Sequence, residues 1–123
     1  MRIGVDMVRV SQIAHSLSVS NTFASKVFAP GERGNAAQMP LSRAYEFLAG
    51  RFAVKEAVIK AMSIRLIGAI AICDIETLAT ADGCPELHLH ESALRISEAL
   101  GISQWNVSIS HENDLAIAVV IAC

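Results

Sequence analysis

Apolar and polar side chains alternate near both ends of the chain, and this period of two predicts strands there. Residues 3–6 alternate in this way and predict a short opening strand. Residues 105–110 and 115–121 alternate again on either side of a turn sequence at 112–114. These two later segments are therefore expected to form a closing β-hairpin.

The middle of the chain has a longer, helical period. Apolar residues recur every three to four positions over residues 41–62, which predicts one long helix. Shorter helices are predicted after Ser11, which is expected to act as an N-cap, and over residues 93–100. Residues 18–39 are small and polar, so we expect a loop between the first two helices.

Two further strands are predicted between the long helix and the last helix. Residues 69–80 are rich in isoleucine and alanine, and residues 87–90 alternate like a returning strand after a turn at 82–85. The predicted order is β-α-α-β-β-α-β-β with short connections. We expect a single α+β domain over residues 1–123, with an antiparallel sheet packed against one long helix and shorter helices.

Composition adds further expectations. Apolar residues make up 53% of the chain, an excess that predicts burial between the subunits of an oligomer. The formal net charge is −2, so we expect no general attraction to nucleic acid. The chain has no run of apolar residues long enough for a membrane span, and Asp6 interrupts its start where a signal peptide needs apolar residues. We therefore expect a cytoplasmic protein.

Asp6 and Glu56 are two carboxylates whose positions metal binding would explain. Glu56 lies about 40° from Phe52 on a helical projection, at the edge of the apolar stripe, where an unpaired carboxylate is costly to desolvate. Asp6 ends the opening strand. Together they suit Mg²⁺, which binds few carboxylates and completes its shell with water and phosphate oxygens. The alternatives are a surface ion pair between Glu56 and Lys60, and a turn or capping role for Asp6.

A third polar group, Ser110-His111-Glu112, stands at the mouth of the closing hairpin. Loops at the end of a sheet commonly gather binding groups. The histidine could hold a phosphate or take part in proton transfer. Ser110 and His111 are not expected to act as a nucleophile and its base, because adjacent strand residues point to opposite faces.

Three segments contain these candidate residues. Residues 4–6 are Gly-Val-Asp, residues 47–57 are Phe-Leu-Ala-Gly-Arg-Phe-Ala-Val-Lys-Glu-Ala, and residues 107–111 are Val-Ser-Ile-Ser-His. In order and spacing they resemble the motifs of bacterial holo-acyl-carrier-protein synthase, the short class of phosphopantetheinyl transferases; the helix motif is the most specific of the three. The resemblance extends nearly from end to end and implies a phosphopantetheinyl-transferase-like fold.

The resemblance implies an enzyme that transfers phosphopantetheine from coenzyme A to a serine of an apo acyl carrier protein and releases adenosine bisphosphate. By this resemblance, Asp6 and Glu56 would bind Mg²⁺ bridging the pyrophosphate of coenzyme A. Lys60 would contact the phosphate being transferred. Glu32 resembles a family acid that would hold the water or hydroxyl; the alternative is a solvated loop glutamate beside Arg33.

The resemblance also assigns residues to coenzyme A binding, namely Arg51, Lys55, Pro85, Ser110 and His111. On the helix, Arg51 projects about 140° away from Glu56, so it is expected to serve a different site from the metal pair of its own chain. This agrees with the family arrangement, in which three protomers form a ring and coenzyme A binds at each subunit interface. The resemblance therefore implies a homotrimer.

The implied partner is an acyl carrier protein or a carrier domain of a fatty-acid or polyketide synthase. Where the family usually offers an arginine to this partner, the chain has Gln12, with Arg9 one turn earlier as a substitute. Cys84 stands where a lysine is common, and residues 63–65 replace a glycine-rich turn. We therefore hypothesise that the enzyme serves an unusual carrier.

Two other functions are compatible with the same residues. A non-catalytic carrier-binding or assembly subunit would keep the fold without turnover, although Asp6 and Glu56 are both present. A small Mg²⁺-dependent nucleotide hydrolase would consume coenzyme A in the absence of any carrier protein. That consumption separates a hydrolase from a transferase.

Overall fold

The structure is a computed structural model that describes residues 1–62 and 64–123. Its elements are β1 (Arg2–Arg9), α1 (Val10–Val19), α2 (Phe23–Val27), α3 (Pro30–Ala37), α4 (Leu41–Met62), β2 (Ile75–Ala79), β3 (Pro85–Leu89), α5 (Glu91–Ala99), β4 (Trp105–Glu112) and β5 (Leu115–Ala122). Two short 3₁₀-helices, η1 (Ile64–Ala69) and η2 (Ile72–Asp74), lie between α4 and β2. Among the helices of the described ranges, none is long and apolar enough to cross a membrane.

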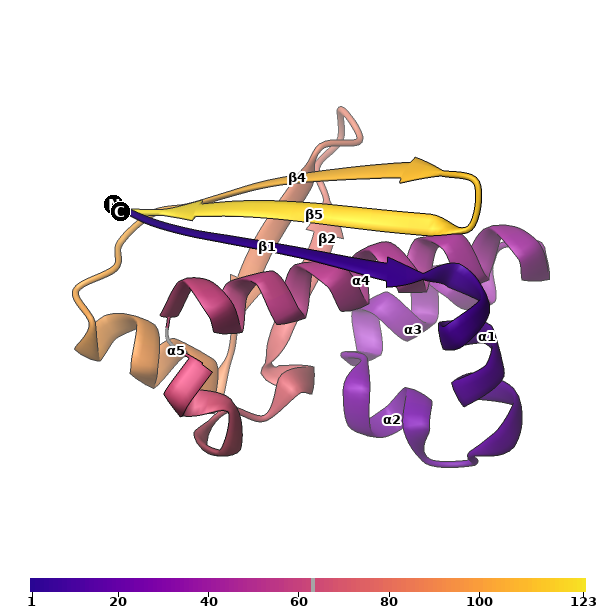
Figure 1. Ribbon diagram of the computed structural model, residues 1–123, viewed down its shortest axis with the longest axis horizontal. Coiled ribbons are helices and arrows are strands. Elements are labelled where there is room, and N and C mark those ends of the chain that lie inside the picture. The colour runs from indigo at the N-terminus through magenta and orange to yellow at the C-terminus, as the bar shows by residue number, and fades with distance from the viewer. Residues whose placement is uncertain (63) are drawn as a thin grey trace.

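The strands form two separate antiparallel sheets. One has three strands in the order β1-β5-β4, and the other is the β2–β3 hairpin. β1 and β5 pair from Arg2 opposite Ala122 to Arg9 opposite Leu115, which brings the two ends of the chain side by side (Figure 1). These sheets and the long helix confirm the predicted α+β fold.

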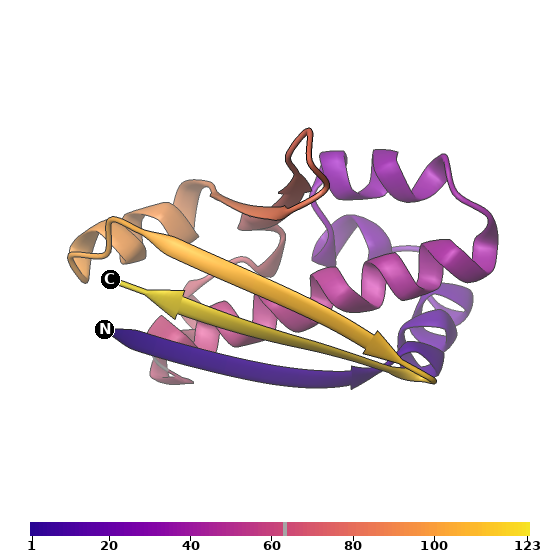
Figure 2. The ribbon, with the colours of Figure 1, turned by 90° about the horizontal axis from the view of Figure 1, so that it is seen from above.

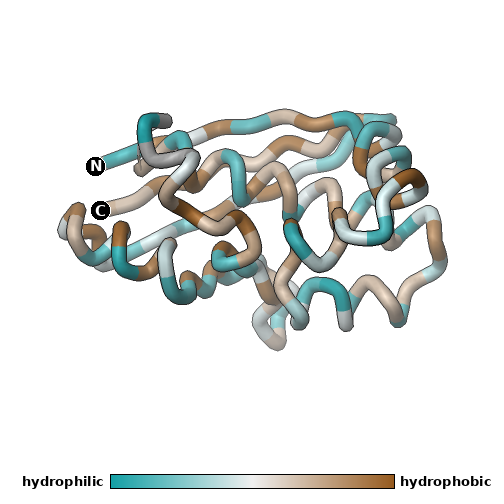
Figure 3. Tube along the Cα trace, turned by 90° about the horizontal axis from the view of Figure 1, so that it is seen from below, coloured by the Kyte–Doolittle hydropathy of each residue, from teal (hydrophilic) through white to brown (hydrophobic). Residues whose placement is uncertain are grey.

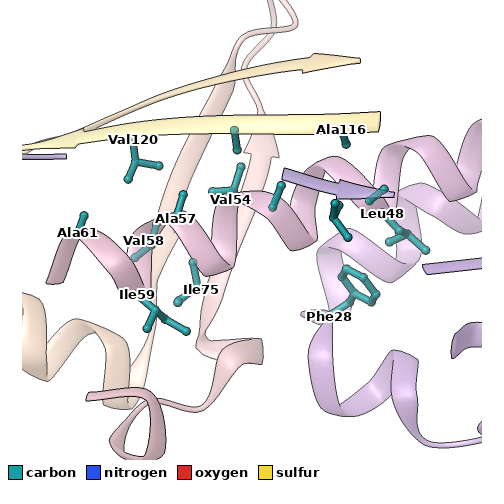
Figure 4. Close-up of a cluster of buried hydrophobic side chains, with 14 of the residues drawn as sticks. Phe28, Leu48, Val54, Ala57, Val58, Ile59, Ala61, Ile75, Ala116 and Val120 are labelled. Carbon is teal, nitrogen blue, oxygen red and sulfur yellow. The ribbon is translucent and has the colours of Figure 1, made fainter. Parts of the chain in front are cut away.

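α4 runs along one face of the three-stranded sheet (Figure 2). The β5 residues on that face are small and buried, among them Ala116 and Val120. Val54 and Ala57 of the helix lie below them in the same buried cluster (Figure 4). Small side chains on both elements allow the helix and sheet to approach closely, and this layer forms the centre of the core.

The predicted loop over residues 18–39 contains two helices, α2 and α3. Pro30 begins α3, where its fixed backbone angle suits the first turn and its missing N–H is not needed. The Glu32 carboxylate accepts a hydrogen bond from the Ala29 N–H at 2.9 Å and closes this turn. The loop prediction was wrong because small polar residues show little apolar periodicity even when they are helical.

Two other boundaries differ from the prediction. The strand expected over residues 69–80 is confined to β2, because 3₁₀ turns occupy the positions before it. The start of α1 is capped by Asp114 instead of Ser11: Asp114 carboxylate oxygens accept hydrogen bonds from the Ser11 N–H at 2.9 Å and the Ser11 hydroxyl at 2.5 Å. Asp114 lies in the β4–β5 turn, so no local pattern around α1 could reveal this cap.

The face of the three-stranded sheet that points away from α4 is apolar and uncovered in the single chain. On β1, Ile3, Val5 and Met7 expose 67%, 50% and 61% of their surface. Leu115 and Ile117 of β5 are also exposed. Apolar positions recur along these strands in Figure 3. These five residues are called the outer face below.

Candidate active site

β1 and α4 approach each other closely at Gly4. A Cβ atom here would lie 1.9 Å from the carbonyl oxygen of Ala57, so only glycine permits the contact. Two residues further along β1, Asp6 is on the same side of the strand and so points toward α4. The glycine of the Gly-Val-Asp segment therefore brings the aspartate beside the helix that carries Glu56 and Lys60.

Asp6, Glu56 and Lys60 form a charged cluster at the edge strand of the sheet. Lys60 Nζ lies 3.0 Å from Asp6 Oδ1 and donates a second hydrogen bond to the Val5 carbonyl oxygen at 3.1 Å. Burial raises the pKa of Glu56 above its ordinary value; the Asp6 carboxylate adds to this rise, and Lys60 opposes it. Two carboxylates and one lysine thus share one partly exposed site.

The chemistry of the donors in this cluster fits a divalent cation. Mg²⁺ is commonly bound by one or two carboxylates, with water and substrate phosphates at its other positions. The Asp6 charge helps to raise the pKa of Glu56, which means that the carboxylates repel each other, and a cation between them would relieve that repulsion. Within the described residues no group of three or more His, Cys, Asp or Glu is arranged to hold a metal, so water or substrate must supply the other ligands.

A second glycine brings β4 onto another side of α4. A Cβ atom at Gly50 would lie 3.0 Å from His111 Nε2 and 3.1 Å from a side-chain carbon of Ile109. His111 Nε2 donates a hydrogen bond to the carbonyl oxygen of Glu46 at 2.9 Å. The imidazole is therefore held directly over the helix.

A pocket of about 260 Å³ opens beside His111, lined by Arg43, Phe47, Arg51, Gly83, Pro85, Ile109 and His111. The Arg51 guanidinium lies 4.0 Å from the centre of the Phe47 ring, and its Nε is buried without a hydrogen-bond partner. Burial lowers the pKa of Arg51, and the Glu32 carboxylate opposes this shift; the guanidinium nevertheless stays charged. A buried cation with an unused donor is suited to an anion such as phosphate.

Arg43 is the residue of this pocket that sequence reasoning missed. Arg43 and Arg51 line the same pocket, and the Arg43 charge contributes to the lowered pKa of Arg51. The ion pair of Arg43 with Glu46, at 3.9 Å, is largely exposed. The signal was present in the sequence, because Arg43, Phe47 and Arg51 recur at every fourth position and so share one side of the helix.

Glu32 and Lys55 lie in neither the charged cluster nor the pocket. Both side chains are fully buried, and Lys55 Nζ lies 2.7 Å from Glu32 Oε1. In the single chain neither side chain has exposed surface. The alternative of a solvated loop glutamate beside Arg33 is wrong, because Glu32 has no exposed surface.

Ser110 and His111 point to opposite faces of the sheet. Pro85 and His111 share the pocket described above, whereas Ser110 lines a separate pocket with Met7 and Leu115 of the outer face. The structure therefore does not bring Ser110 to Arg51 within one chain.

The departures from the family motifs lie at three places. Gln12 lines a pocket of about 490 Å³ between α1, α2 and α4, and its lining is mainly apolar, with Phe23 and Phe52 as the aromatic members. Cys84 is exposed in the β2–β3 turn. The third departure is the segment 63–65 in place of a glycine-rich turn, and its first residue, Ser63, lies outside the described residues.

Comparison with known proteins decides the family. The sequence model of the 4'-phosphopantetheinyl transferase superfamily matches residues 2–120. The chain belongs to this family. A holo-(acyl-carrier-protein) synthase from Desulfovibrio desulfuricans is 42% identical over 120 residues, which cover 97% of this chain and 94% of that protein. The motif-based prediction of a holo-acyl-carrier-protein synthase is thus confirmed.

Solved structures of phosphopantetheinyl transferases share the fold. The ACPS–CoA complex from Chronobacterium ammoniagenes has a TM-score of 0.86 at 33% identity, and the match covers 98% of this chain and 95% of that one. The Helicobacter pylori holo-(acyl-carrier-protein) synthase in complex with coenzyme A has a TM-score of 0.83 at 25% identity, with 98% and 99% covered. The charged cluster and the arginine pocket of this transferase therefore lie in a fold that binds coenzyme A in its relatives.

Proposed function

We propose that this phosphopantetheinyl transferase moves phosphopantetheine from coenzyme A to a serine of an acyl carrier protein or carrier domain, using Mg²⁺ and releasing adenosine 3',5'-bisphosphate. The strongest support is that α4 contributes to two different charged sites. The cluster of Asp6, Glu56 and Lys60 suits a metal-bound pyrophosphate. The pocket with Arg43 and Arg51 suits a further phosphate. Coenzyme A carries both a pyrophosphate and a 3'-phosphate on its nucleotide.

The proposed chemistry assigns a role to each residue of the cluster. The serine oxygen forms a bond to a pyrophosphate phosphorus, the bond to the adenosine bisphosphate oxygen breaks, and the serine proton leaves. Lys60 would balance negative charge on the phosphoryl oxygens. Glu56 is a half-buried carboxylate beside Lys60, and it would accept the proton through a water. Asp6 and Glu56 would hold Mg²⁺, which neutralises pyrophosphate charge when bound.

A homotrimer would join the two charged sites of different protomers. Arg51 projects about 140° from Glu56 around α4, so the two sites of one chain face different directions. The outer face supplies a surface for association, because its apolar side chains are exposed in the single chain. One protomer would then present the metal pair, and its neighbour would present Arg51, Pro85 and His111. Ser110 lies on the opposite face of β4, beside the outer face, and would contact coenzyme A from there.

The pocket beside α1 is the proposed docking surface for the carrier. It adjoins the metal pair, because Val8 follows Asp6 on the same side of β1 and Phe52 precedes Glu56 by one turn. α1 itself contains no Asp, Glu, Lys or Arg, and Gln12 lines the pocket. This uncharged helix supports the hypothesis of an unusual carrier. Comparable turnover on an ordinary free acidic carrier protein would contradict that hypothesis.

The decisive experiment is intact-mass spectrometry of an apo carrier protein incubated with this transferase, coenzyme A and Mg²⁺. We expect a gain of one phosphopantetheine that is abolished by EDTA and by Glu56→Ala. Carrier domains of large synthases should be tested beside a free carrier. Binding of coenzyme A without modification of any carrier would favour a non-catalytic subunit, and loss of coenzyme A without a carrier would favour a hydrolase.

A further inference from the structure

Glu32 and Lys55 form a fully buried ion pair with several hydrogen-bond partners inside the protein. Lys55 Nζ donates hydrogen bonds to Glu32 Oε1 at 2.7 Å and to the carbonyl oxygen of Ile75, and it lies 5.7 Å from the centre of the Phe28 ring. Glu32 Oε1 also accepts from the Ala29 N–H, and Glu32 Oε2 accepts from the Thr77 N–H, both at 2.9 Å. Both charged ends thus have their partners inside the protein.

These hydrogen bonds join three elements that are distant in the sequence. Glu32 and Ala29 belong to the start of α3, Lys55 to the middle of α4, and Ile75 and Thr77 to β2. Among the described strands, β2 pairs with β3 alone, and an isolated two-stranded hairpin is marginally stable. The β2–β3 hairpin therefore depends on such contacts for its position against α4.

The hydrogen-bonded group of Glu32, Lys55, Ile75 and Thr77 is called the clamp below, and the pocket lined by Arg43 and Arg51 is called the arginine pocket. On both α4 and β2, the clamp lies close to residues at the arginine pocket. Along α4, Arg51 precedes Lys55 by one turn, which is about 6 Å. Along β2, Ala79 follows Thr77 by two residues, about 7 Å, and Ala79 pairs with Pro85. Arg51 of α4 and Pro85 of β3 line the same pocket. The clamp therefore connects these two walls by a short route through buried structure.

We propose that the Glu32–Lys55 ion pair is a positioning device that sets the spacing between Arg51 and the β2–β3 hairpin, and hence the affinity for the nucleotide part of coenzyme A. This proposal rests on the proposed function, which places the nucleotide in the arginine pocket. Directional hydrogen bonds fix both the rotation of α4 and the register of β2 against it, whereas an apolar contact permits sliding. Neither residue touches the substrate.

The test is the double variant Glu32→Gln with Lys55→Met, which removes both charges while keeping side-chain volume, so that no unpaired charge is left buried. The probe is adenosine 3',5'-bisphosphate, measured by titration calorimetry, together with KM for coenzyme A and kcat. For the double variant we expect Kd for adenosine 3',5'-bisphosphate and KM for coenzyme A to rise about tenfold or more, because small displacements of binding groups have large effects. We expect kcat at saturating coenzyme A to stay within about threefold of the wild-type value.

Thr77→Val is the matched control. The Thr77 hydroxyl is buried and has no hydrogen-bond partner, while its N–H stays available to Glu32. This variant alters the same region and leaves the clamp intact, so Kd and KM are expected to be unchanged.

Two kinetic results would overturn the proposal. Unchanged Kd and KM in a double variant that only melts at a lower temperature would show a purely structural pair. A fall in kcat of about a hundredfold or more with unchanged KM would show that Glu32 takes part in the chemistry itself.

Hydrogen exchange of the wild-type chain tests the clamp without any variant or ligand. The Thr77 N–H donates to Glu32 and not to β3, so its exchange rate reports on the clamp. We expect it to be among the slowest amides of the hairpin. Exchange as fast as that of the turn at Gly83 would overturn the proposal. Absence of adenosine bisphosphate binding to the wild type would instead contradict the proposed function, while the exchange rates would still decide the clamp.

Discussion

Lys55 and Glu56 are neighbours on α4, yet their surroundings are opposite. The helix turns them about 100° apart. Lys55 is fully buried and bound to Glu32, whereas Glu56 is half-buried and shares an open cluster with Asp6. Burial lowers the pKa of Lys55 and raises that of Glu56, and in both cases it disfavours the charged form. Only Lys55 has a buried partner in direct hydrogen-bond contact. Adjacent ionisable residues of one motif can therefore serve packing and chemistry respectively.

The largest expected effect is on catalysis at Glu56. We expect Glu56→Ala to lower kcat/KM by about a thousandfold or more, because it removes half of the metal pair. Circular dichroism should show an intact fold, since this side chain is not part of the core. Activity within tenfold of the wild type would exclude Glu56 from the metal site.

The next effect is on stability at Lys55. Lys55→Met leaves the Glu32 carboxylate buried without its partner, and we expect the free energy of unfolding to fall by about 3–5 kcal/mol. Urea denaturation measures this change. The matched control is Lys60→Met, whose exposed ion pair with Asp6 should contribute less than about 1 kcal/mol. Equal losses in the two variants would remove the distinction between the two lysines.

A smaller effect is expected at the outer face. Val5→Glu places a charge among exposed apolar side chains, so we expect a monomer by light scattering at micromolar concentration and activity reduced about tenfold or more. Leu94→Glu, at an exposed apolar position of α5, is the control and should leave the mass unchanged. A stable monomer of the wild type would contradict the interface-site proposal.

The smallest effect is the pH dependence of stability at Glu56. Because its folded pKa is raised, the folded protein retains a proton that the unfolded chain has lost, and stability falls as pH rises through that window. The metal-free Glu56→Gln variant has no such carboxyl group, so it does not lose this stability as pH rises. We expect the variant to be slightly more stable than the wild type at pH 7, by less than about 1 kcal/mol, and equally stable below the ordinary glutamate pKa. Melting temperatures in EDTA across pH measure this difference, and a variant less stable at pH 7 would contradict it.

Much of the fold was predictable because strands and helices follow from the spacing of apolar residues that are close in the sequence. The helix predicted over residues 41–62 coincides with α4, and the two alternating segments at the end form β4 and β5. α2 and α3 were missed because their polar residues show no apolar stripe. The Asp114 cap of α1 was missed because the capping residue comes from the opposite end of the chain.

The candidate site was predictable only in part. Helix periodicity places Glu56 and Lys60 one turn apart. The resemblance of the motifs to a known family implied that Asp6 joins them, and the packing of Gly4 against Ala57 shows how a strand distant in the sequence reaches the helix. The same motifs suggested ligand contacts for Lys55, which the structure instead pairs with a buried carboxylate. They also did not single out Arg43, although its spacing from Phe47 and Arg51 places the three residues on one side of the helix; the pocket that Arg43 shares with Pro85 appears only in the tertiary structure.

The amino-acid sequence by itself determined the family, the long helix, the closing hairpin and the presence of two carboxylates suited to Mg²⁺. Period and spacing belong to consecutive residues, so they can be read without coordinates. Only the tertiary structure decided that Glu32 and Lys55 are buried together, that Arg51 keeps an unused donor, and that the sheet exposes an apolar outer face. Burial and charge pairing depend on elements that meet in space from distant parts of the chain, and a pattern of neighbouring residues does not contain that information.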